Sequence, residues 1–486
     1  MDESAIKAPI DHVESQLEAQ TKNDKANEIL IQSSHRVVLN PENNARVLKK
    51  IDLHVLPIVL GIYLLQALDK ATLAYASVFG LVDDAHLHGQ QYSWLGSVVY
   101  LAQLVAQPLI AYMLVKLPLG KFLGVIVLLW GIALSTMPAA HNFGGLLACR
   151  LVLGLFEAGV APAFIALTQM WWRRREQPVR LGAWYAMNGI TNIFGSLLTY
   201  GIGHIHSTVL NSYQIIFLFF GLITVVYSFF VYWLLPDSPV SARFLNDEDK
   251  LVAIERLRAN NQGIEGNQWK WSHVREAALD IKTWLWGAMM FSISVPSGGV
   301  STFGPLIIKA FGFNKFQTIL LNMPFGAVQL IATMGGAWAA TTMKKKSPVL
   351  AFLSLPPIVG CVMLLHLPRT ANAKGPLLVA YYLGAVVKVC QTSQALLSPT
   401  KIHSLALFVV LIGLYAVQVF YLVTLNKKQG KRREALGKKA VLVDKSMNRV
   451  KAGNAGIEDD TEDDGVGQHA FDDKTDLDNE DFIFVY

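Results

Sequence analysis

The sequence of 486 residues is poor in charge and in cysteine. Asp, Glu, Lys and Arg make up 16% of it, whereas hydrophobic residues make up 52%. A soluble chain of this length would form about three domains, but here the charges gather in blocks between long apolar runs. The cysteines Cys149, Cys361 and Cys390 lie in or beside apolar runs and lack the spacing of a metal site. We therefore expect them to be small buried hydrophobic residues.

Motifs of soluble enzymes are also missing. No GxxxxGK(S/T) phosphate loop is present, because Lys121 in "LPLGKF" is followed by Phe122, and so no ATP-driven motor is encoded. No HExxH zinc motif occurs, and "GIGHIH" lacks the third glycine of a dinucleotide fold. We interpret His204 and His206 as loop residues. We expect no enzyme activity, no cofactor and no metal.

Apolar runs between residues 53 and 425 dominate the chain, each close to the ~20 residues that cross a ~30 Å hydrocarbon core. They predict an all-α polytopic membrane protein with about eleven recognisable spans. The expected spans are 53–79, 92–114, 119–140, 143–171, 181–203, 213–235, 283–308, 317–341, 348–367, 376–390 and 403–425. The expected regions are a tail (1–50), a first bundle (51–235), a central loop (236–282), a second bundle (283–425) and a basic, then acidic, disordered tail (426–486).

Lys and Arg concentrate in alternate loops. The loop "RRREQPVR" after the fourth span is strongly basic, whereas the loops after the first, third and fifth spans contain no Lys or Arg. Excess Lys and Arg mark cytoplasmic loops, which predicts a cytoplasmic N-terminus and central loop. The same rule accounts for the net charge of +6 without a nucleic-acid partner. No signal peptide is recognised, so the first span is expected to direct insertion. In the central loop, "NDEDKLVAIERLRANN" predicts an amphipathic helix capped by Asn246.

The two halves differ in length. The second is shorter than the first by about 40 residues, roughly one span and a loop. With a cytoplasmic N-terminus, eleven crossings would also place the basic block 427–439 on the non-cytoplasmic side of the membrane. Excess Lys and Arg instead predict that this block lies in the cytoplasm. These observations predict that a span is missing or rearranged within 384–404.

Four ionisable side chains lie inside the apolar runs. Asp69 and Lys70 are adjacent in "LLQALDKATLAYA", and Arg150 and Glu157 occur in "CRLVLGLFEAG". Each costs at least ~2.5–3.5 kcal/mol at the bilayer centre, so such residues mark a pathway by default. Arg150 and Glu157 share a helical face, about 10 Å apart along the axis. The charges either pair to hold the bundle together, or exchange protons and bind an anionic substrate.

Uncharged polar side chains in the spans either form hydrogen bonds between helices or bind the substrate. Gln66 and Asn188 are taken as candidate substrate-binding residues. The others are Gln103, Gln107, Asn192, Asn322 and Gln329. Trp171 and Trp172, beside the Arg cluster, are predicted to anchor the chain at the membrane interface.

Several segments together resemble the fungal allantoate permease family, in the anion:cation symporter branch of the major facilitator superfamily. They are "DKATLAYASVFGL", "QYSW", "RLVLGLFEAGVAP", "WWRRREQPVRLGAWYAMNGI", "LLPDSPVSARFLNDEDK" and "GFNKFQTILLNMPFGAVQ". The similarity covers roughly residues 50–383 and 405–450. It implies two six-helix bundles and alternating access. It also implies proton-coupled uptake of a small organic anion, such as allantoate, ureidosuccinate or nicotinate, across the plasma membrane. We expect the protein to be a monomer.

The resemblance also implies residue roles. It assigns proton coupling to Asp69 and Glu157 and anion binding to Lys70 and Arg150. "LVKLPLGKF" resembles the superfamily motif of the loop between spans 2 and 3, with Lys121 in the position of a basic gating residue.

Two departures from the family pattern stand out. Relatives carry an acidic residue before proline where this chain has Gln107-Pro108, and continuous spans 10 and 11 are not found. The second bundle is therefore expected to be incomplete. The alternative function is a non-transporting or degenerate permease paralogue that acts as a membrane sensor or is inactive.

Overall fold

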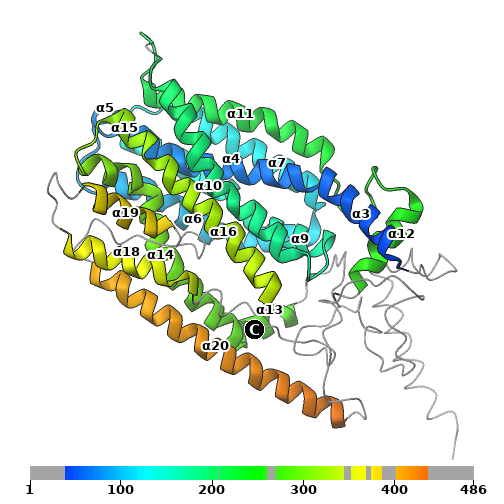
Figure 1. The fold of residues 1–486 in the computed structure, drawn as a ribbon. Helices are drawn as coiled ribbons and strands as arrows, with labels where there is room; N and C mark the ends of the chain where they lie inside the picture. Colours follow the sequence, from blue (N-terminus) through cyan, green and yellow to red (C-terminus); the bar gives the residue numbers. More distant parts are fainter. Residues whose placement is uncertain are drawn as a thin grey trace, which may run out of the picture.

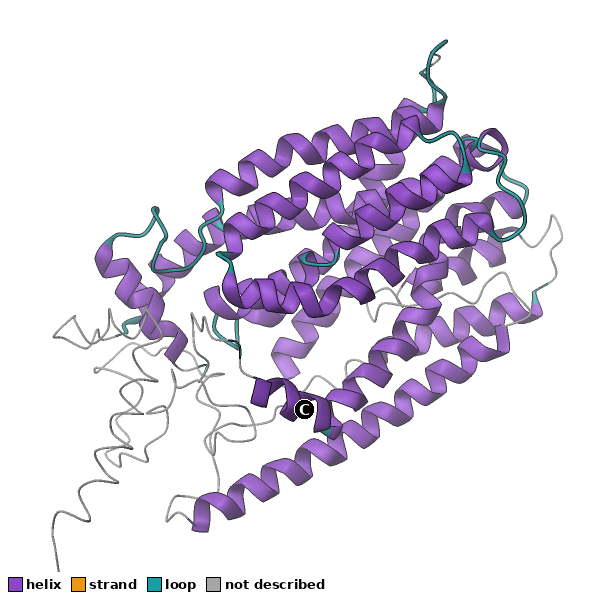
Figure 2. Ribbon diagram, turned by 180° about the vertical axis from the view of Figure 1, so that it is seen from behind, coloured by secondary structure: helices purple, strands orange, loops and turns teal. Residues whose placement is uncertain are grey.

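The structure is a computed structural model, and it describes residues 39–205, 207–258, 260, 269, 271–343, 352–367, 374–385 and 401–435. Over these ranges the chain folds into α-helices with one 3₁₀ turn, Met137–Ala139, and contains no strand (Figures 1 and 2). The expected disordered acidic tail and the core of the 384–404 gap lie outside the described residues.

The helices of the first half run back and forth along one common direction (Figure 1). The first predicted span corresponds to α4, and α3 precedes it, beginning in the range 1–50 that was expected to be a tail and ending at His54. The helices are α3 (Pro41–His54), α4 (Leu56–Val78), α5 (Leu81–Asp84), α6 (Gln91–Lys116), α7 (Leu119–Thr136), α8 (Phe143–Glu157), α9 (Val160–Trp171), α10 (Gln177–Ile202) and α11 (Ser212–Leu234).

The fourth predicted span is broken into α8 and α9 immediately after Glu157. Gly159, at the break, lies against α7, and a Cβ there would come within 3.0 Å of Ile126 Cδ1 and 3.2 Å of Phe122. A side chain at this position would require Ile126 and Phe122 to shift by a few tenths of an ångström. The break places the end of α8 at Glu157, whose carboxylate is buried.

After α11 the chain forms α12, the helix predicted for the central loop, then α13, and then the helices of the second half. These helices are α12 (Asp247–Arg258), α13 (Trp271–Leu279), α14 (Ile281–Ala310), α15 (Lys315–Leu320), α16 (Asn322–Met343), α18 (Leu355–His366), α19 (Lys374–Ala385) and α20 (Lys401–Ala435). Helix α20 continues ten residues beyond the expected end of the last span at 425 and carries part of the basic block.

Six helical segments in the described part are long and apolar enough to cross a membrane. They are Pro41–Val78, Gln91–Lys116, Leu119–Ala139, Phe143–Trp171, Ser212–Leu234 and Lys315–Ala339. Helix α10 has 26 residues but is not among them. Its buried polar residues, which include Asn192, Ser196 and Thr199, lower its hydropathy, and they face other helices rather than lipid.

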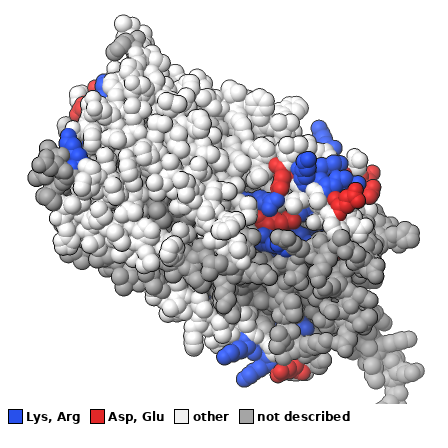
Figure 3. Space-filling view, in the orientation of Figure 1, with Lys and Arg blue, Asp and Glu red and all other residues white. Residues whose placement is uncertain are grey.

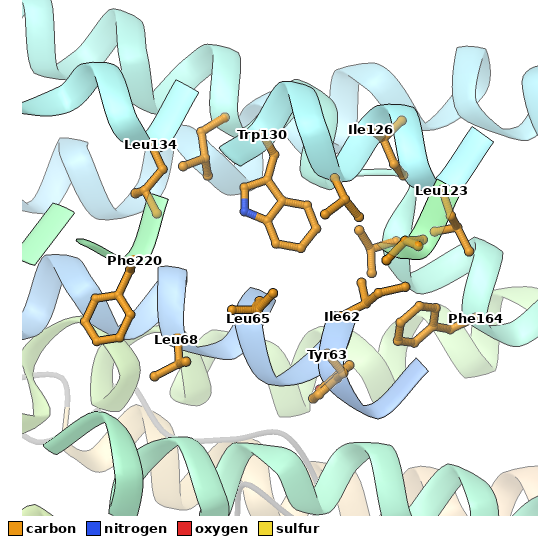
Figure 4. Packing of buried hydrophobic residues seen from close by; sticks show 14 of the residues in the cluster. Ile62, Tyr63, Leu65, Leu68, Leu123, Ile126, Trp130, Leu134, Phe164 and Phe220 are labelled. Atoms are coloured by element: carbon orange, nitrogen blue, oxygen red, sulfur yellow. The ribbon is translucent and has the colours of Figure 1, made fainter. Parts of the chain in front are cut away.

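The core of the first half lies between α4, α7, α9 and α11. Trp130 of α7 is fully buried and points toward α4, above Leu65 (Figure 4). Phe164 of α9 and Phe220 of α11 close the two sides of this core. Such a dense apolar environment makes any polar group inside it dependent on a specific partner.

The halves pack against each other along α10 and α16 and along α4 and α14. At the closest point of the first pair, a Cβ on Gly189 would lie 2.6 Å from Gly326 O. A Cβ on Gly326 would in turn lie 2.5 Å from Gly189 O. The two helix backbones therefore touch, as small residues allow in membrane helices.

Candidate functional site

The four charged residues predicted from the sequence come together between α4 and α8. Asp69, Arg150 and Glu157 are 1%, 3% and 2% exposed. Lys70 Nζ lies 2.9 Å from Glu157 Oε1, and the Lys70 side chain keeps 36% of its surface exposed. This ion pair joins the two helices, and the exposed part of Lys70 is open to a ligand.

Asp69 has a partner that sequence reasoning missed. The indole Nε1–H of Trp130 donates a hydrogen bond to Asp69 Oδ2, whereas Oδ1 has no hydrogen-bond partner in the described part of the chain. Glu157, Arg150 and Lys70 interact electrostatically with this carboxylate. One signal could have pointed to Trp130, because it lies in the middle of a span and membrane tryptophans concentrate at the interfaces.

Arg150 is a buried guanidinium with unused donors. Its Nε and Nη2 have no hydrogen-bond partner among the residues that the structure describes. The groups that interact with it electrostatically are Tyr92, Glu157, Asp69 and Tyr100. Burying a charged group without hydrogen bonds is costly, and the planar guanidinium matches a carboxylate in a bidentate geometry. Arg150 is therefore suited to receive an anion.

Tyrosines and an amide border the Lys70–Glu157 pair. Asn188 Nδ2 donates to Tyr63 OH at 2.9 Å and to Tyr185 O at 3.0 Å. Lys70 interacts electrostatically with Tyr63 and Tyr185, which brings Asn188 to the edge of the charged group. Gln66 is buried on α4, one helical turn before Lys70. Its role in substrate binding stays a prediction.

Of the other amides, Gln107 Nε2 donates to Ala158 O at 3.2 Å within the first half, whereas Asn192, Asn322 and Gln329 join the two halves of the molecule. Asn192 Nδ2 donates to Gln329 Oε1 at 3.0 Å, and Asn322 Nδ2 donates to Asn192 Oδ1 at 3.2 Å. Tyr381 OH continues this chain to Asn322 Oδ1 at 3.3 Å. These side chains act here as helix–helix hydrogen bonds, one of the two interpretations that the sequence left open.

Lys121 lies away from the four charges, at the start of α7. Its backbone N–H donates to Asp237 Oδ1 at 3.1 Å, and its side chain is exposed. A Cβ on Gly120 would come within 2.5 Å of Leu235 O. The carboxylate of Asp237 therefore caps α7 from a distant part of the chain, and a gating role of the Lys121 side chain stays a prediction.

Charged residues gather at the end of the molecule that carries α3 and α12 (Figure 3). Asp249 accepts from Lys50 Nζ at 2.6 Å and from Arg46 Nη2 at 2.8 Å. Burial would raise the pKa of Asp249, but these two cations outweigh it and hold the pKa below its usual value. Arg256 is bound to both carboxylate oxygens of Glu176 at 2.8 and 2.9 Å. The network fastens α3 and α12 to the loop between α9 and α10.

The prediction that Trp171 and Trp172 are interfacial anchors is wrong. Each is 1% exposed. Trp172 Nε1 donates to Asp52 Oδ1 at 2.8 Å, and Arg180 binds Asp52 at 2.6 Å. Trp172 is held by Asp52, and the Trp171 ring stacks on Phe244 with ring centroids 6.0 Å apart, so both indoles are buried inside the protein.

Comparison with known proteins identifies the family. The model of the Major Facilitator Superfamily matches residues 59–419. The chain belongs to this superfamily. It is therefore a multi-pass membrane protein of a family of transporters, and the all-α fold class predicted from the sequence is confirmed. No group of three or more His, Cys, Asp or Glu in the described residues could hold a metal ion.

Three similar proteins come from fungi. An uncharacterized transporter of Schizosaccharomyces pombe, C757.13, is 37% identical over 69% of this chain and 64% of its own length. The thiamine pathway transporter THI73 of Saccharomyces cerevisiae is 37% identical over 67% of this chain and 62% of its own. The allantoate permease of the same yeast is 31% identical over 67% of this chain and 61% of its own. The resemblance to the allantoate permease family is confirmed at the family level.

The match spans less than two thirds of the length of these three relatives. Among solved structures, the proton:xylose symporter XylE bound to 6-bromo-6-deoxy-D-glucose superimposes with a TM-score of 0.53. The match covers 78% of this chain and 88% of that structure at 15% identity. This similarity shows the fold of the Major Facilitator Superfamily and nothing finer.

Proposed function

We propose that this superfamily member is a proton-coupled importer of a small organic anion that works by alternating access. The observation that carries the proposal is Arg150, a buried guanidinium whose Nε and Nη2 lack hydrogen-bond partners in the described chain. It interacts electrostatically with the buried carboxylates of Asp69 and Glu157. Ionisable groups buried in membrane helices mark substrate pathways and proton relays.

In this proposal the cations receive the substrate and the carboxylates carry protons. Arg150 binds the substrate carboxylate with its free donors, and the exposed part of Lys70 gives a second point of attraction. Asp69 and Glu157 take up protons on one side of the membrane and release them on the other. The similarity to the allantoate permease supports a small carboxylate as the substrate class.

The proposed location is the plasma membrane, with the N-terminus and the α3–α12 end in the cytoplasm. The basic loop "RRREQPVR" lies at that end, and Lys and Arg are in excess on the cytoplasmic side. We propose that the protein acts as a monomer in the lipid bilayer.

Uptake of radiolabelled allantoate, nicotinate and ureidosuccinate into cells that express the chain tests the proposal. We expect faster uptake of at least one of these anions at acidic than at neutral external pH. Uptake is expected to be lost on collapse of the proton gradient. A chain that reaches the membrane but takes up no carboxylate in a pH-dependent way would rule the proposal out.

A non-transporting membrane sensor is the second candidate. It is favoured by the sequence, because the second half is about 40 residues shorter than the first, roughly one span and a loop. Sequencing the transcript separates the two candidates. Coding sequence for a further span between residues 384 and 404 would remove the reason for the second one.

A further inference from the structure

Helix α20 keeps one side against the protein from its membrane span to its end. Successive buried residues on this side are three, four, seven and four positions apart, which keeps them on one face of a helix. The opposite face therefore points away from the protein over the same length. The buried side chains are Tyr415, Gln418, Leu422, Gln429 and Arg433, each no more than 8% exposed.

The outward face of α20 changes from apolar to cationic along one stripe. Val417 and Phe420 are 51% and 75% exposed, which places them against lipid in a membrane-spanning helix. Lys427 and Lys431 follow Phe420 by seven and eleven residues, and both are exposed. Lys428, also exposed, follows Val417 by eleven residues. Because these intervals are two or three helical turns, the cations lie directly beyond the lipid-facing side chains on the same face.

Aromatic side chains mark the level of the membrane interface beside α20. Helices α14 and α20 pack against each other, and Tyr421 interacts electrostatically with Asp280, the residue before α14. Trp284, in the first turn of α14, is 70% exposed, and Trp and Tyr concentrate at the membrane–water interface. Lys427 lies about 9 Å beyond Tyr421 along the axis, and its long side chain reaches back to the headgroups. Lys431 is one turn farther, within the screening length of about 8 Å at physiological ionic strength.

The cationic stretch lies at the end of the molecule that is proposed above to be cytoplasmic. The far end of α20 is at the same end as α3 and α12 (Figures 1 and 2). Lys427, Lys428 and Lys431 form no ion pair with any residue of the described ranges. Glu434 is the one acid between residues 426 and 435, so the exposed side of this stretch carries a net positive charge. It therefore suits an anionic partner.

We propose that Lys427, Lys428 and Lys431, the α20 cationic face, bind anionic phospholipid headgroups of the cytoplasmic leaflet. Anionic lipids give this leaflet a negative surface potential, which attracts basic residues next to a membrane helix. Each ammonium group binds phosphate oxygens as a point charge, while the acyl chains of the same lipid lie against Val417 and Phe420. The face is separate from the charged site between α4 and α8, so the inference holds whether or not the protein transports an anion.

The acidic run 458–464, "EDDTEDD", is another possible anionic partner within the same chain. The stripe favours lipid, because lipids that cover Val417 and Phe420 bring their headgroups next to the lysines. A tail segment would have to displace headgroups that the bilayer supplies at high local concentration. Changing the acids of this run to amides in the full-length chain separates the two occupants.

Native mass spectrometry of the full-length protein, delipidated in a non-ionic detergent, tests the inference. The probes are phosphatidylserine and phosphatidylcholine with identical acyl chains, so the difference in Kd reports the headgroup. Each cation near the surface contributes about fivefold to the affinity, the equivalent of about 1 kcal/mol. We expect phosphatidylserine to bind at least about tenfold more tightly than phosphatidylcholine. High salt should reduce this preference.

Two triple variants assign the preference to the α20 cationic face. Changing all three lysines to glutamine (Lys427→Gln, Lys428→Gln and Lys431→Gln) should abolish it. Changing the same three to arginine keeps the charge and should keep the preference. Because the three side chains are exposed, the Tm should be the same in both variants.

The control variant removes an equal charge elsewhere. It combines Lys49→Gln on α3, Arg243→Gln before α12 and Arg275→Gln on α13, all exposed positions, and it should retain the preference for phosphatidylserine. Glycerophosphoserine has the same headgroup without acyl chains. At equal concentration it should not displace the lipid, because it cannot contact Val417 and Phe420.

Several results would overturn the inference. They are a preference that survives in the glutamine variant, an equal loss in the control variant, and displacement by glycerophosphoserine, which would indicate a site for free anions. A preference that appears only when the acids of 458–464 are changed to amides would show that the acidic run occupies the face, and would overturn it as well. Failure of carboxylate uptake would reject the proposed function and leave the lipid site unaffected.

Discussion

Trp130 of α7 donates a hydrogen bond from its indole nitrogen to the carboxylate of Asp69 in α4, across 61 residues of sequence. Both side chains are buried in the first half of the molecule. A carboxylate in an apolar core depends on such a donor, because a buried charge without a hydrogen-bond partner has a high desolvation cost. The packing of α7 against α4 therefore determines the hydrogen bonding of the Asp69 carboxylate.

Replacing Trp130 with Phe keeps an aromatic ring and removes the donor. Loss of a hydrogen bond to a charged group costs about 1.5–3 kcal/mol, and we expect uptake to fall at least about tenfold while the protein still reaches the membrane. Initial uptake rates, normalised to surface abundance, measure the effect. Trp171→Phe is the matched control, because the buried Trp171 indole nitrogen has no hydrogen-bond partner in the described chain. Equal losses in both variants would mean that ring packing, not the donor, matters.

Arg150→Lys keeps the positive charge but removes the planar guanidinium. A lysine cannot make the bidentate contact with a carboxylate, so we expect the KM for the substrate anion to rise at least about tenfold. Concentration-dependent uptake measures this change. Arg275→Lys, an exposed position on α13, is the control and should leave the KM unchanged. An unaltered KM in Arg150→Lys would place the substrate carboxylate elsewhere.

Gly189→Ala tests the contact between the two halves. The added Cβ would meet Gly326 O at 2.6 Å and Leu330 N at 2.8 Å, and overpacking of this kind costs typically about 1–3 kcal/mol. We expect a lower Tm of the purified protein and slower uptake. Gly201→Ala lies on the same helix with no heavy atom within 4 Å of the new Cβ, and its Tm should not fall. A drop of equal size in both variants would point to α10 itself rather than to its contact with α16.

Asp249→Asn should release α3 from α12. Lys50 and Arg46 hold the pKa of Asp249 below its usual value, so the ionised carboxylate stabilises the contact above the unfolded pKa of about 3.9. That stability is lost as the pH falls through the lower folded pKa. Limited proteolysis between α3 and α4 should be faster in Asp249→Asn at neutral pH. In the parent protein, it should become faster only in strong acid.

The control for this variant is Glu248→Gln, whose carboxylate is 76% exposed and lies 3.5 Å from Arg46. An exposed ion pair of that kind contributes little, so its proteolysis should match that of the parent. Faster cleavage in Glu248→Gln would show that overall charge, and not the buried carboxylate, holds α3.

Asp237→Ala and Lys121→Ala separate a helix cap from a gating side chain. Asp237 caps α7 through the backbone N–H of Lys121, and loss of a cap costs about 0.5–2 kcal/mol. We expect a lower Tm for Asp237→Ala only. If Lys121 acts as a gating residue, Lys121→Ala should slow uptake without changing the Tm. A variant with normal uptake would remove the gating prediction.

Local properties of the chain were enough to predict its helices and its class. Apolar length predicts a span because an unpaired backbone cannot cross lipid, and α12 follows from a polar helical pattern with acids in its first turn. The four charged residues could be recognised because an ionisable side chain inside an apolar span has a high free-energy cost. Packing details escaped prediction, among them the break after Glu157 and the burial of Trp172, since both depend on helices distant in sequence.

The sequence by itself determined which residues must be helical and which charges must find partners, because hydropathy and helical periodicity are local. Only the tertiary structure decided the partners. It paired Lys70 with Glu157, bound Asp69 to Trp130 and left Nε and Nη2 of Arg150 without a hydrogen-bond partner among the described residues. The same four charges could have paired in other ways. Helix packing selected this one, since a buried ion pair or hydrogen bond forms only where two backbones bring the groups within about 3 Å.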